Sequence, residues 1–193
     1  MTIPTREDER EARDALEFIR DTMESATSFT AVSGWGLVAV GVVGLVAAGL
    51  SWSRGSIADL DIWVPAALVA IIASATTTAS KARKLEVPLW SGSFRKMVWV
   101  MVPTLLAGAI LTGALWANDA ASLLPGTWLS LYGAGVAAGG TYSLRTFRWM
   151  GLIFLALGAV TLFWSGSELI LMAASFGGLH VAAGIHVIRQ HGG

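Results

Sequence analysis

The sequence predicts an all-α, polytopic membrane protein, in which an amphipathic cytoplasmic helix precedes a bundle of six transmembrane helices. The first observation is composition: of 193 residues, 54% are hydrophobic and only 13% are charged, whereas soluble domains carry about 25% charged residues. The second is a set of six long runs without Asp, Glu, Lys or Arg, and the third is a very uneven distribution of Lys and Arg between the loops. With no cysteine in the chain, disulfide frameworks and Cys-ligated metal sites are excluded.

Each of the six uncharged runs has the length of one membrane crossing. They contain 25, 19, 22, 25, 19 and 20 residues, and a helix needs about 20 apolar residues to cross a hydrocarbon core of about 30 Å. None of them shows the alternation that barrel strands require. We therefore expect a transmembrane bundle over residues 29–190, with spans at about 30–52, 62–80, 97–117, 124–144, 149–165 and 168–188.

The basic residues predict the orientation of these spans. Alternate sides of the bundle carry 12 and 1 Lys and Arg residues, and the richer side includes both termini. Because cytoplasmic loops carry the excess of Lys and Arg, both termini are expected in the cytoplasm. All nine tryptophans fall near span ends, where indole prefers the headgroup level. No secretory or organelle presequence precedes the first apolar run, which favours the plasma (inner) membrane of a bacterium.

Residues 1–28 are expected to form the cytoplasmic amphipathic helix. Its narrow apolar stripe includes Leu16, Ile19 and Met23, which follow the three- and four-residue spacing of one helix face. The segment holds 4 basic and 8 acidic side chains, and helices that bind anionic lipid are normally rich in Lys and Arg. Binding of this helix to the bilayer surface is therefore disfavoured.

The loop over residues 81–96 has the opposite charge. It holds 5 basic residues, among them Lys81, Arg83 and Lys84, and one acidic residue. Three interpretations follow for the N-terminal helix. It docks on this loop, or it presents residues 5–28 to a cytoplasmic or membrane protein, or it is a solvated helix with no special role.

His180 is the one ionisable side chain deep within a predicted span. Ionisable residues inside a membrane often mark ion paths or proton relays, so a ligand or proton-handling role is one interpretation. The other is a neutral imidazole that bonds to a neighbouring helix. His186 is six residues further on, about 120° around the helix at 100° per residue, so the two are poorly placed to share a metal. We expect no metal and no cofactor.

Small residues recur four apart within the spans, as at Gly135 and Gly139 in the fourth. Such spacing lets two helix backbones approach closely, which matters in lipid because hydrophobicity does not itself drive helix association there. The close approach can be inside the bundle or between two copies of the chain.

The sequence contains no recognisable set of catalytic residues. No histidine, acid and nucleophile can be assembled within one leaflet, no paired acids lie in a span, and no HExxH motif occurs. The acids on the side opposite the termini are expected to cap helices, as at Asp61 and Glu168, or to be solvated, with an external cation site as the alternative. They are Asp59, Asp61, Asp119 and Glu168. We expect a protein that is not an enzyme and does not bind nucleic acid directly.

Three stretches of the chain carry a resemblance: residues 14–36, residues 131–135, and residues 177–180 together with the closing His191-Gly-Gly. On these the chain resembles an uncharacterised family of small bacterial six-helix integral membrane proteins with an N-terminal amphipathic cytoplasmic helix. The resemblance runs over the whole chain. It implies a gene context near winged-helix regulators, and hence sensing or regulation, but it assigns no functional residues.

The sequence therefore favours a regulatory, sensing or accessory membrane subunit that acts through its cytoplasmic face. A small-solute or ion transporter or channel is the alternative, since six helices that begin inside permit a three-plus-three inverted repeat. A polar midplane would favour transport, and its near absence favours interaction. The expected partners are the bilayer, a protein bound by the N-terminal helix, or a second copy of the chain.

Overall fold

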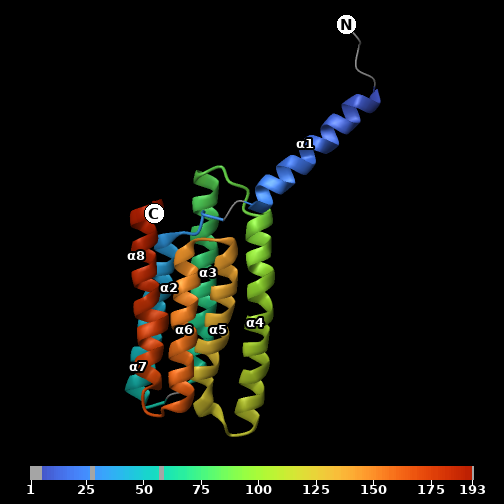
Figure 1. The fold of residues 1–193 in the computed structure, drawn as a ribbon. Coiled ribbons are helices and arrows are strands. Elements are labelled where there is room, and N and C mark those ends of the chain that lie inside the picture. Colours follow the sequence, from blue (N-terminus) through green and yellow to red (C-terminus); the bar gives the residue numbers. More distant parts are fainter. Residues whose placement is uncertain (1–5, 27–28, 57–58, 193) are drawn as a thin grey trace.

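The structure is a computed structural model that describes residues 6–26, 29–56 and 59–192, and every regular element among them is helical. A long helix, α1, precedes a bundle that contains all the other helices (Figure 1). The helices are α1 Arg6–Ala26, α2 Gly34–Arg54, α3 Leu60–Lys84, α4 Gly92–Ala117, α5 Leu124–Gly139, α6 Arg145–Phe163, α7 Glu168–Met172 and α8 His180–His191. Short 3₁₀ turns at Ala121–Leu123 and Gly140–Tyr142 flank α5, and a π-helix at Ala173–Leu179 joins α7 to α8.

Five of the helical stretches in the described residues are long and apolar enough to cross a membrane. They are α2, α3, α4, α6 and the continuous stretch Glu168–His191 that contains α7 and α8. The chain is therefore a multi-pass, all-helical membrane protein. The fourth expected span, 124–144, corresponds to α5, which has only 16 residues before the helix tightens into the 3₁₀ turn.

Local capping explains where several helices begin. Helix α2 begins at Gly34, four residues after the expected start at 30, because the Ser33 hydroxyl accepts a hydrogen bond from the Gly36 amide at 3.2 Å. Helix α4 begins five residues before the expected start at 97, because Ser91 caps it in the same way through the Phe94 amide at 3.3 Å. Gly55, with φ of 65°, ends α2 in the left-handed conformation that glycine tolerates best.

Two antiparallel helix pairs form the packed centre of the bundle, and glycines allow their backbones to meet. In the α2–α8 pair, a Cβ on Gly34 would lie 2.8 Å from the Gly184 carbonyl oxygen, and a Cβ on Gly184 would lie 2.7 Å from that of Gly34. In the α5–α6 pair, a Cβ on Gly133 would lie 2.8 Å from the Gly151 carbonyl oxygen. No side chain fits at these contacts, as is typical of helix association in lipid.

The small-residue pair singled out in the fourth span packs within the chain. A Cβ on Gly135 would meet the hydroxyl of Thr104, and one on Gly139 would lie 3.3 Å from the Met97 side chain. Thr104 and Met97 belong to α4. These two glycines therefore bring α5 close to α4.

Helices α3 and α4 are the outer helices of the bundle. Within the bundle, α3 packs mainly on α2, and α4 packs mainly on α5. Only 11% of the most apolar stretch of α3 and 6% of that of α4 is buried, against 44% for α2. Most of their apolar surface is therefore exposed on the outside of the bundle.

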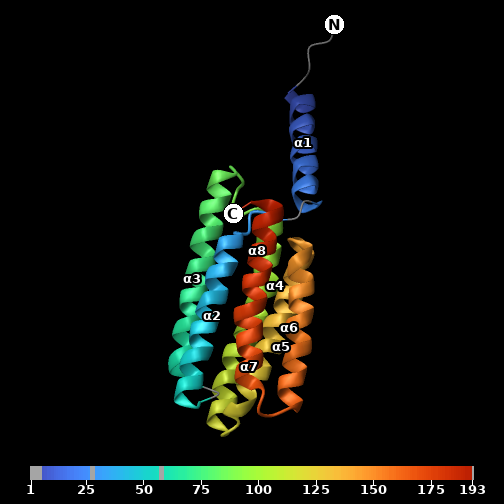
Figure 2. The same ribbon diagram turned by 90° about the vertical axis from the view of Figure 1, so that its left-hand side faces the viewer.

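Helix α1 lies outside the bundle. It extends beyond the end at which α8 finishes (Figures 1 and 2), and its last turns lie beside the start of α4 (Figure 1). This end is called the α1 end below. The expected helix over residues 1–28 is described for Arg6–Ala26, and its remaining residues lie outside the described ones.

Candidate functional site

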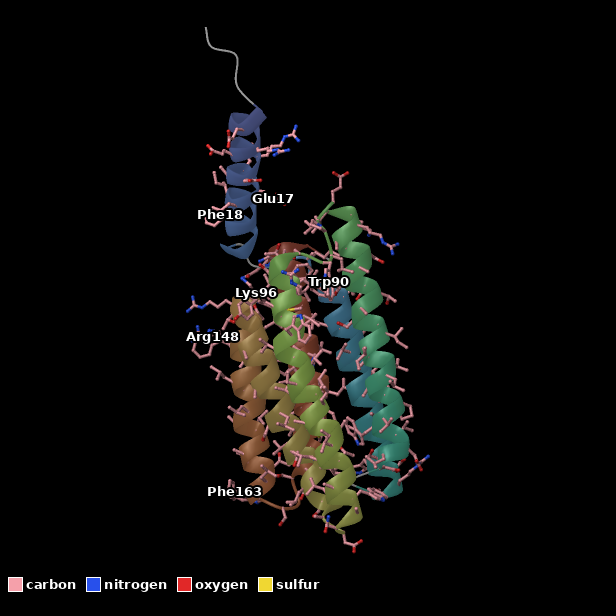
Figure 3. The ribbon with its side chains drawn as sticks, turned by 90° about the vertical axis from the view of Figure 1, so that its right-hand side faces the viewer. Glu17, Phe18, Trp90, Lys96, Arg148 and Phe163 are labelled. Carbon is pink, nitrogen blue, oxygen red and sulfur yellow. The ribbon has the colours of Figure 1, made fainter. Side chains whose placement is uncertain are left out.

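The two ends of the bundle have opposite charge. Lys96 and Arg148 lie at the α1 end, and Phe163 lies at the opposite end (Figure 3). The basic residues of the α1 end are Lys81, Arg83, Lys84, Arg95, Lys96, Arg145, Arg148 and Arg189, with Glu86 as the acidic one. The charged residues of the opposite end are Arg54, Asp59, Asp61, Asp119 and Glu168. A basic surface therefore stands beside the acidic helix α1.

The apolar stripe of α1 faces solvent. Leu16, Ile19 and Met23 are 66%, 53% and 65% exposed. Helix α1 meets the bundle at α4, and among the described residues this contact leaves the three side chains more than half exposed. An isolated amphipathic helix is marginal in water, so this stripe is a surface that gains stability when it is covered.

In the segment after α1, residues 29–33, every residue except Thr30 is buried, although the segment is not helical. The Phe29 amide donates to the Tyr142 carbonyl at 2.9 Å, and the Ser143 hydroxyl donates to the Phe29 carbonyl at 2.7 Å. The Phe29 ring also contacts that of Phe94 in α4, with centroids 4.8 Å apart. This connecting segment therefore ties the chain that leaves α1 to the α5–α6 turn and to α4.

Lys81 lies near the end of α3 at the α1 end, and only 6% of it is exposed. Its ammonium donates to the carbonyls of Gly192 at 2.7 Å, His191 at 3.1 Å and Val32 at 3.4 Å. A cation at the carbonyl end of α8 also interacts favourably with the helix dipole. Lys81 thus joins α3 to the connecting segment and to the end of α8.

Arg83 and Lys84 are exposed at the same end of α3. The three basic residues expected to form one docking surface therefore divide by burial. Lys81 is bound to carbonyls inside the protein, and the other two are accessible from outside.

His180 lies at the centre of an aromatic cluster formed by Tyr132, Phe154, Phe176 and His180. The Tyr132 hydroxyl and the His180 Nε2 are 2.7 Å apart, so α5 and α8 share a hydrogen bond inside the bundle. Phe176 stacks on the imidazole with centroids 6.0 Å apart, and Phe154 meets it edge-on at 5.4 Å. His180 is 1% exposed. This is the interhelical bond of a buried histidine, surrounded by rings.

The π-helix shapes this cluster. Ala173–Leu179 widens the helix just before His180, whose Nδ1 lies 3.4 Å from the Ser175 carbonyl oxygen, five residues earlier. Such π segments often mark functional positions. Ser175 is fully buried, and its hydroxyl has no hydrogen-bond partner among the described residues.

Two of the acidic residues at the opposite end have different partners. Asp59 pairs with Arg54 at 3.2 Å, and Glu168 accepts a hydrogen bond from the Gly166 amide at 2.8 Å. Among the described residues, no group of three or more His, Cys, Asp or Glu side chains could hold a metal.

Sequence reasoning did not find two parts of this arrangement. Residues 29–33 read as the beginning of an apolar span, and only the capping geometry of Ser33 separates them from the helix. Both tyrosines of the chain, Tyr132 and Tyr142, fall within the predicted span 124–144, and Tyr132 lies nearer its middle. A buried tyrosine usually finds a hydrogen-bond partner, so this position was a signal for a polar partner of His180.

Comparison with protein-family models, curated proteins and solved structures finds no match to this chain. Its fold defines a multi-pass, all-helical membrane protein in which α1 lies outside the bundle, at the basic end.

Proposed function

We propose that the protein is a non-enzymatic regulatory or accessory membrane subunit that binds a protein partner through α1. The observation that carries this proposal is the exposure of Leu16, Ile19 and Met23 on a helix that extends beyond the bundle. The acidic flanks of the stripe favour a protein partner with a basic rim around an apolar groove. A helix laid into such a groove is a common mode of recognition.

Binding at α1 has a route into the bundle. The connecting segment follows α1, and Phe29 is bonded to Tyr142 and Ser143 at the α5–α6 turn. The same segment reaches Lys81 through the Val32 carbonyl. A partner that moves α1 therefore pulls on residues 29–33. These residues are bonded to the α5–α6 turn and to Lys81 of α3, which in turn binds the end of α8.

The proposal includes a sixth crossing by α5 and a cytoplasmic α1 end. In support of the crossing, the helical run from Ala121 to Tyr142 lies alongside α4 and α6 within the same bundle (Figure 1). In support of the orientation, the α1 end carries nearly all the basic residues of the bundle. Cysteines introduced at Ser91 and Ser122 test it: an impermeant thiol reagent applied to intact cells should label only the second.

Crosslinking tests the partner directly. A photo-reactive residue at Ile19 in the full-length chain, expressed in its own membrane, should form an adduct with one other protein, whereas the same residue at Arg13 should not. The triple variant Leu16→Ser, Ile19→Ser, Met23→Ser should lower recovery of that protein about tenfold. The control variant Arg13→Ser, Glu17→Ser changes exposed polar positions of the same helix and should leave recovery unchanged.

Two outcomes would contradict the proposal. An Ile19 crosslink within the same chain to residues 81–96 would show that the helix docks on its own basic loop. A chain that lacks residues 1–24 but keeps full activity and the same partners would show that α1 does not carry the function.

Transport is the second candidate, and the pairing of the helices favours it. Helix α2, the first of three, packs on α3 and on α8, while α5, the first of the next three, packs on α6 and on α4. If α2, α3 and α4 are taken to correspond to α5, α6 and the α7–α8 stretch, the α2–α3 contact corresponds to α5–α6, and the α2–α8 contact corresponds to α5–α4. Transporters built from inverted repeats show such a correspondence. Solute or ion flux in proteoliposomes that persists without residues 1–24 would favour this function.

A further inference from the structure

A groove of about 250 Å³ opens between α2 and α3 at the α1 end. Ser33 and Trp35 line it from the start of α2, and Thr76, Ser80, Lys81 and Lys84 line it from the last turns of α3. Its volume would hold about eight water molecules at about 30 Å³ each, and so a phosphate with a small polyol attached. The groove lies at the ends of α2 and α3, and both helices are long and apolar enough to cross a membrane.

The polar groups of the groove divide into a cationic part and an accepting part. Lys84 is exposed, and Trp35 is 60% exposed beside it; an ammonium and an indole N–H both donate to an anion. The hydroxyls of Thr76 and Ser80 donate to the carbonyls of Ile72 and Thr76, at 2.8 Å and 2.9 Å. Their oxygens therefore remain as acceptors, which suit the hydroxyl groups of a ligand.

The apolar surface next to the groove continues the same helix rows. Thr76, Ser80 and Lys84 are spaced four apart on α3, and the row continues away from the α1 end with Ile72 and Leu68, which are 61% and 57% exposed. On α2, Val42 and Val46 are 50% and 57% exposed. A ligand whose head sits in the groove can thus lay hydrocarbon chains along both helices.

We propose that this α2–α3 groove binds an anionic glycerophospholipid with a hydroxylated headgroup, such as phosphatidylglycerol. Lys84 and the Trp35 indole hold the phosphate, the Thr76 and Ser80 oxygens accept hydrogen bonds from the glycerol hydroxyls, and the acyl chains cover the apolar rows. The buried charge of Lys81 at the edge of the groove adds to the attraction for the phosphate. This site does not involve α1 and is independent of the function proposed above.

Lipid titration of the delipidated, full-length protein in a neutral detergent tests the site. Phosphatidylglycerol should bind more tightly than phosphatidylcholine with the same chains, as measured by native mass spectrometry. Lys84→Gln should weaken phosphatidylglycerol about fivefold, since a basic side chain near the headgroups contributes about 1 kcal/mol. Arg83→Gln, which removes a neighbouring exposed charge outside the groove, should leave the affinity unchanged.

Two further measurements separate the parts of the site. Ser80→Ala should weaken phosphatidylglycerol but not phosphatidic acid, which has no glycerol hydroxyl to donate. Soluble glycerol phosphate, which lacks acyl chains, should compete weakly. Equal losses in Lys84→Gln and Arg83→Gln, equal binding of phosphatidylcholine, or strong competition by glycerol phosphate would each overturn the proposal.

Discussion

The α2–α8 and α5–α6 pairs are closely packed, whereas the outer helices α3 and α4 are mostly exposed. In α2–α8 and α5–α6 the backbones approach until a Cβ at the contact glycines would overlap the neighbouring carbonyl. A Cβ on Gly113 of α4, by contrast, would meet no described atom within 4 Å. Mean hydropathy does not separate the two regions: it is 1.9 for α2 and 1.7 for α6, and 1.7 for α3 and 1.9 for α4.

The difference teaches where specificity comes from in lipid. Because hydrocarbon chains solvate Leu and Ile as well as another helix does, apolar side chains alone do not decide which helices pair. Close backbone contact and a few polar bonds decide it, and the outer helices keep a face that is free for lipid. Helix α3 is fastened at its end by the polar contacts of Lys81.

The largest expected effect is from Gly151→Leu in the α5–α6 pair. Its side chain would overlap the Ala137 amide nitrogen and lie 2.6 Å from the Gly133 carbonyl oxygen at its first carbon. Backbone cannot move aside as a flexible side chain can, so the free energy of unfolding should fall by about 3 kcal/mol. Unfolding in mixed micelles measures it; a wild-type value would show that these two helices are not closely packed.

Lys81→Met should have the next largest effect. It keeps the length of the side chain but leaves the carbonyls of His191 and Gly192 without their charged donor. Charged hydrogen bonds contribute about 2 kcal/mol, and hydrogen exchange should rise at the end of α8. The control is Lys84→Met, an exposed neighbour on α3, and an equal loss in both variants would contradict the role of burial.

Tyr132→Phe should have a smaller effect, about 1 kcal/mol, because it removes one interhelical hydrogen bond and keeps the ring. The aromatic packing around His180 remains, so the protein should still fold. His180→Gln, combined with Tyr132→Phe in a double-mutant cycle, measures the coupling between the two groups. Strictly additive losses would show that their bond contributes nothing.

The smallest expected effect is from Gly113→Leu in α4. The substitution adds a side chain that faces open space, and it replaces a poor helix former. The free energy of unfolding should change by less than about 0.5 kcal/mol. A large loss would mean that this face of α4 packs against a second copy of the chain, and a change in oligomer mass on gel filtration would then accompany it.

The local features of the chain were predictable, and the contacts between distant residues were not. Hydropathy predicted the membrane-spanning stretches at α2, α3, α4, α6 and Glu168–His191, because the length of an apolar run is a property of that run alone. The start of α4 was missed, because a capping serine and a polar first turn do not register in hydropathy.

The candidate site shows the same division. The charges that separate the two ends, and the stripe on α1, can be read from residue spacing. The burial of Lys81 depends on carbonyls that lie 49 to 111 residues away in the chain.

The sequence by itself determined a helical membrane protein with one basic end, because transfer of each side chain into hydrocarbon has a free energy that depends little on its neighbours. The tertiary structure alone decided that α2 meets α8, that Tyr132 meets His180 and that the connecting segment is buried. Glycine and serine occur throughout these spans. Which of them make contacts depends on the three-dimensional fit of whole helices, and that fit is a property of pairs of surfaces.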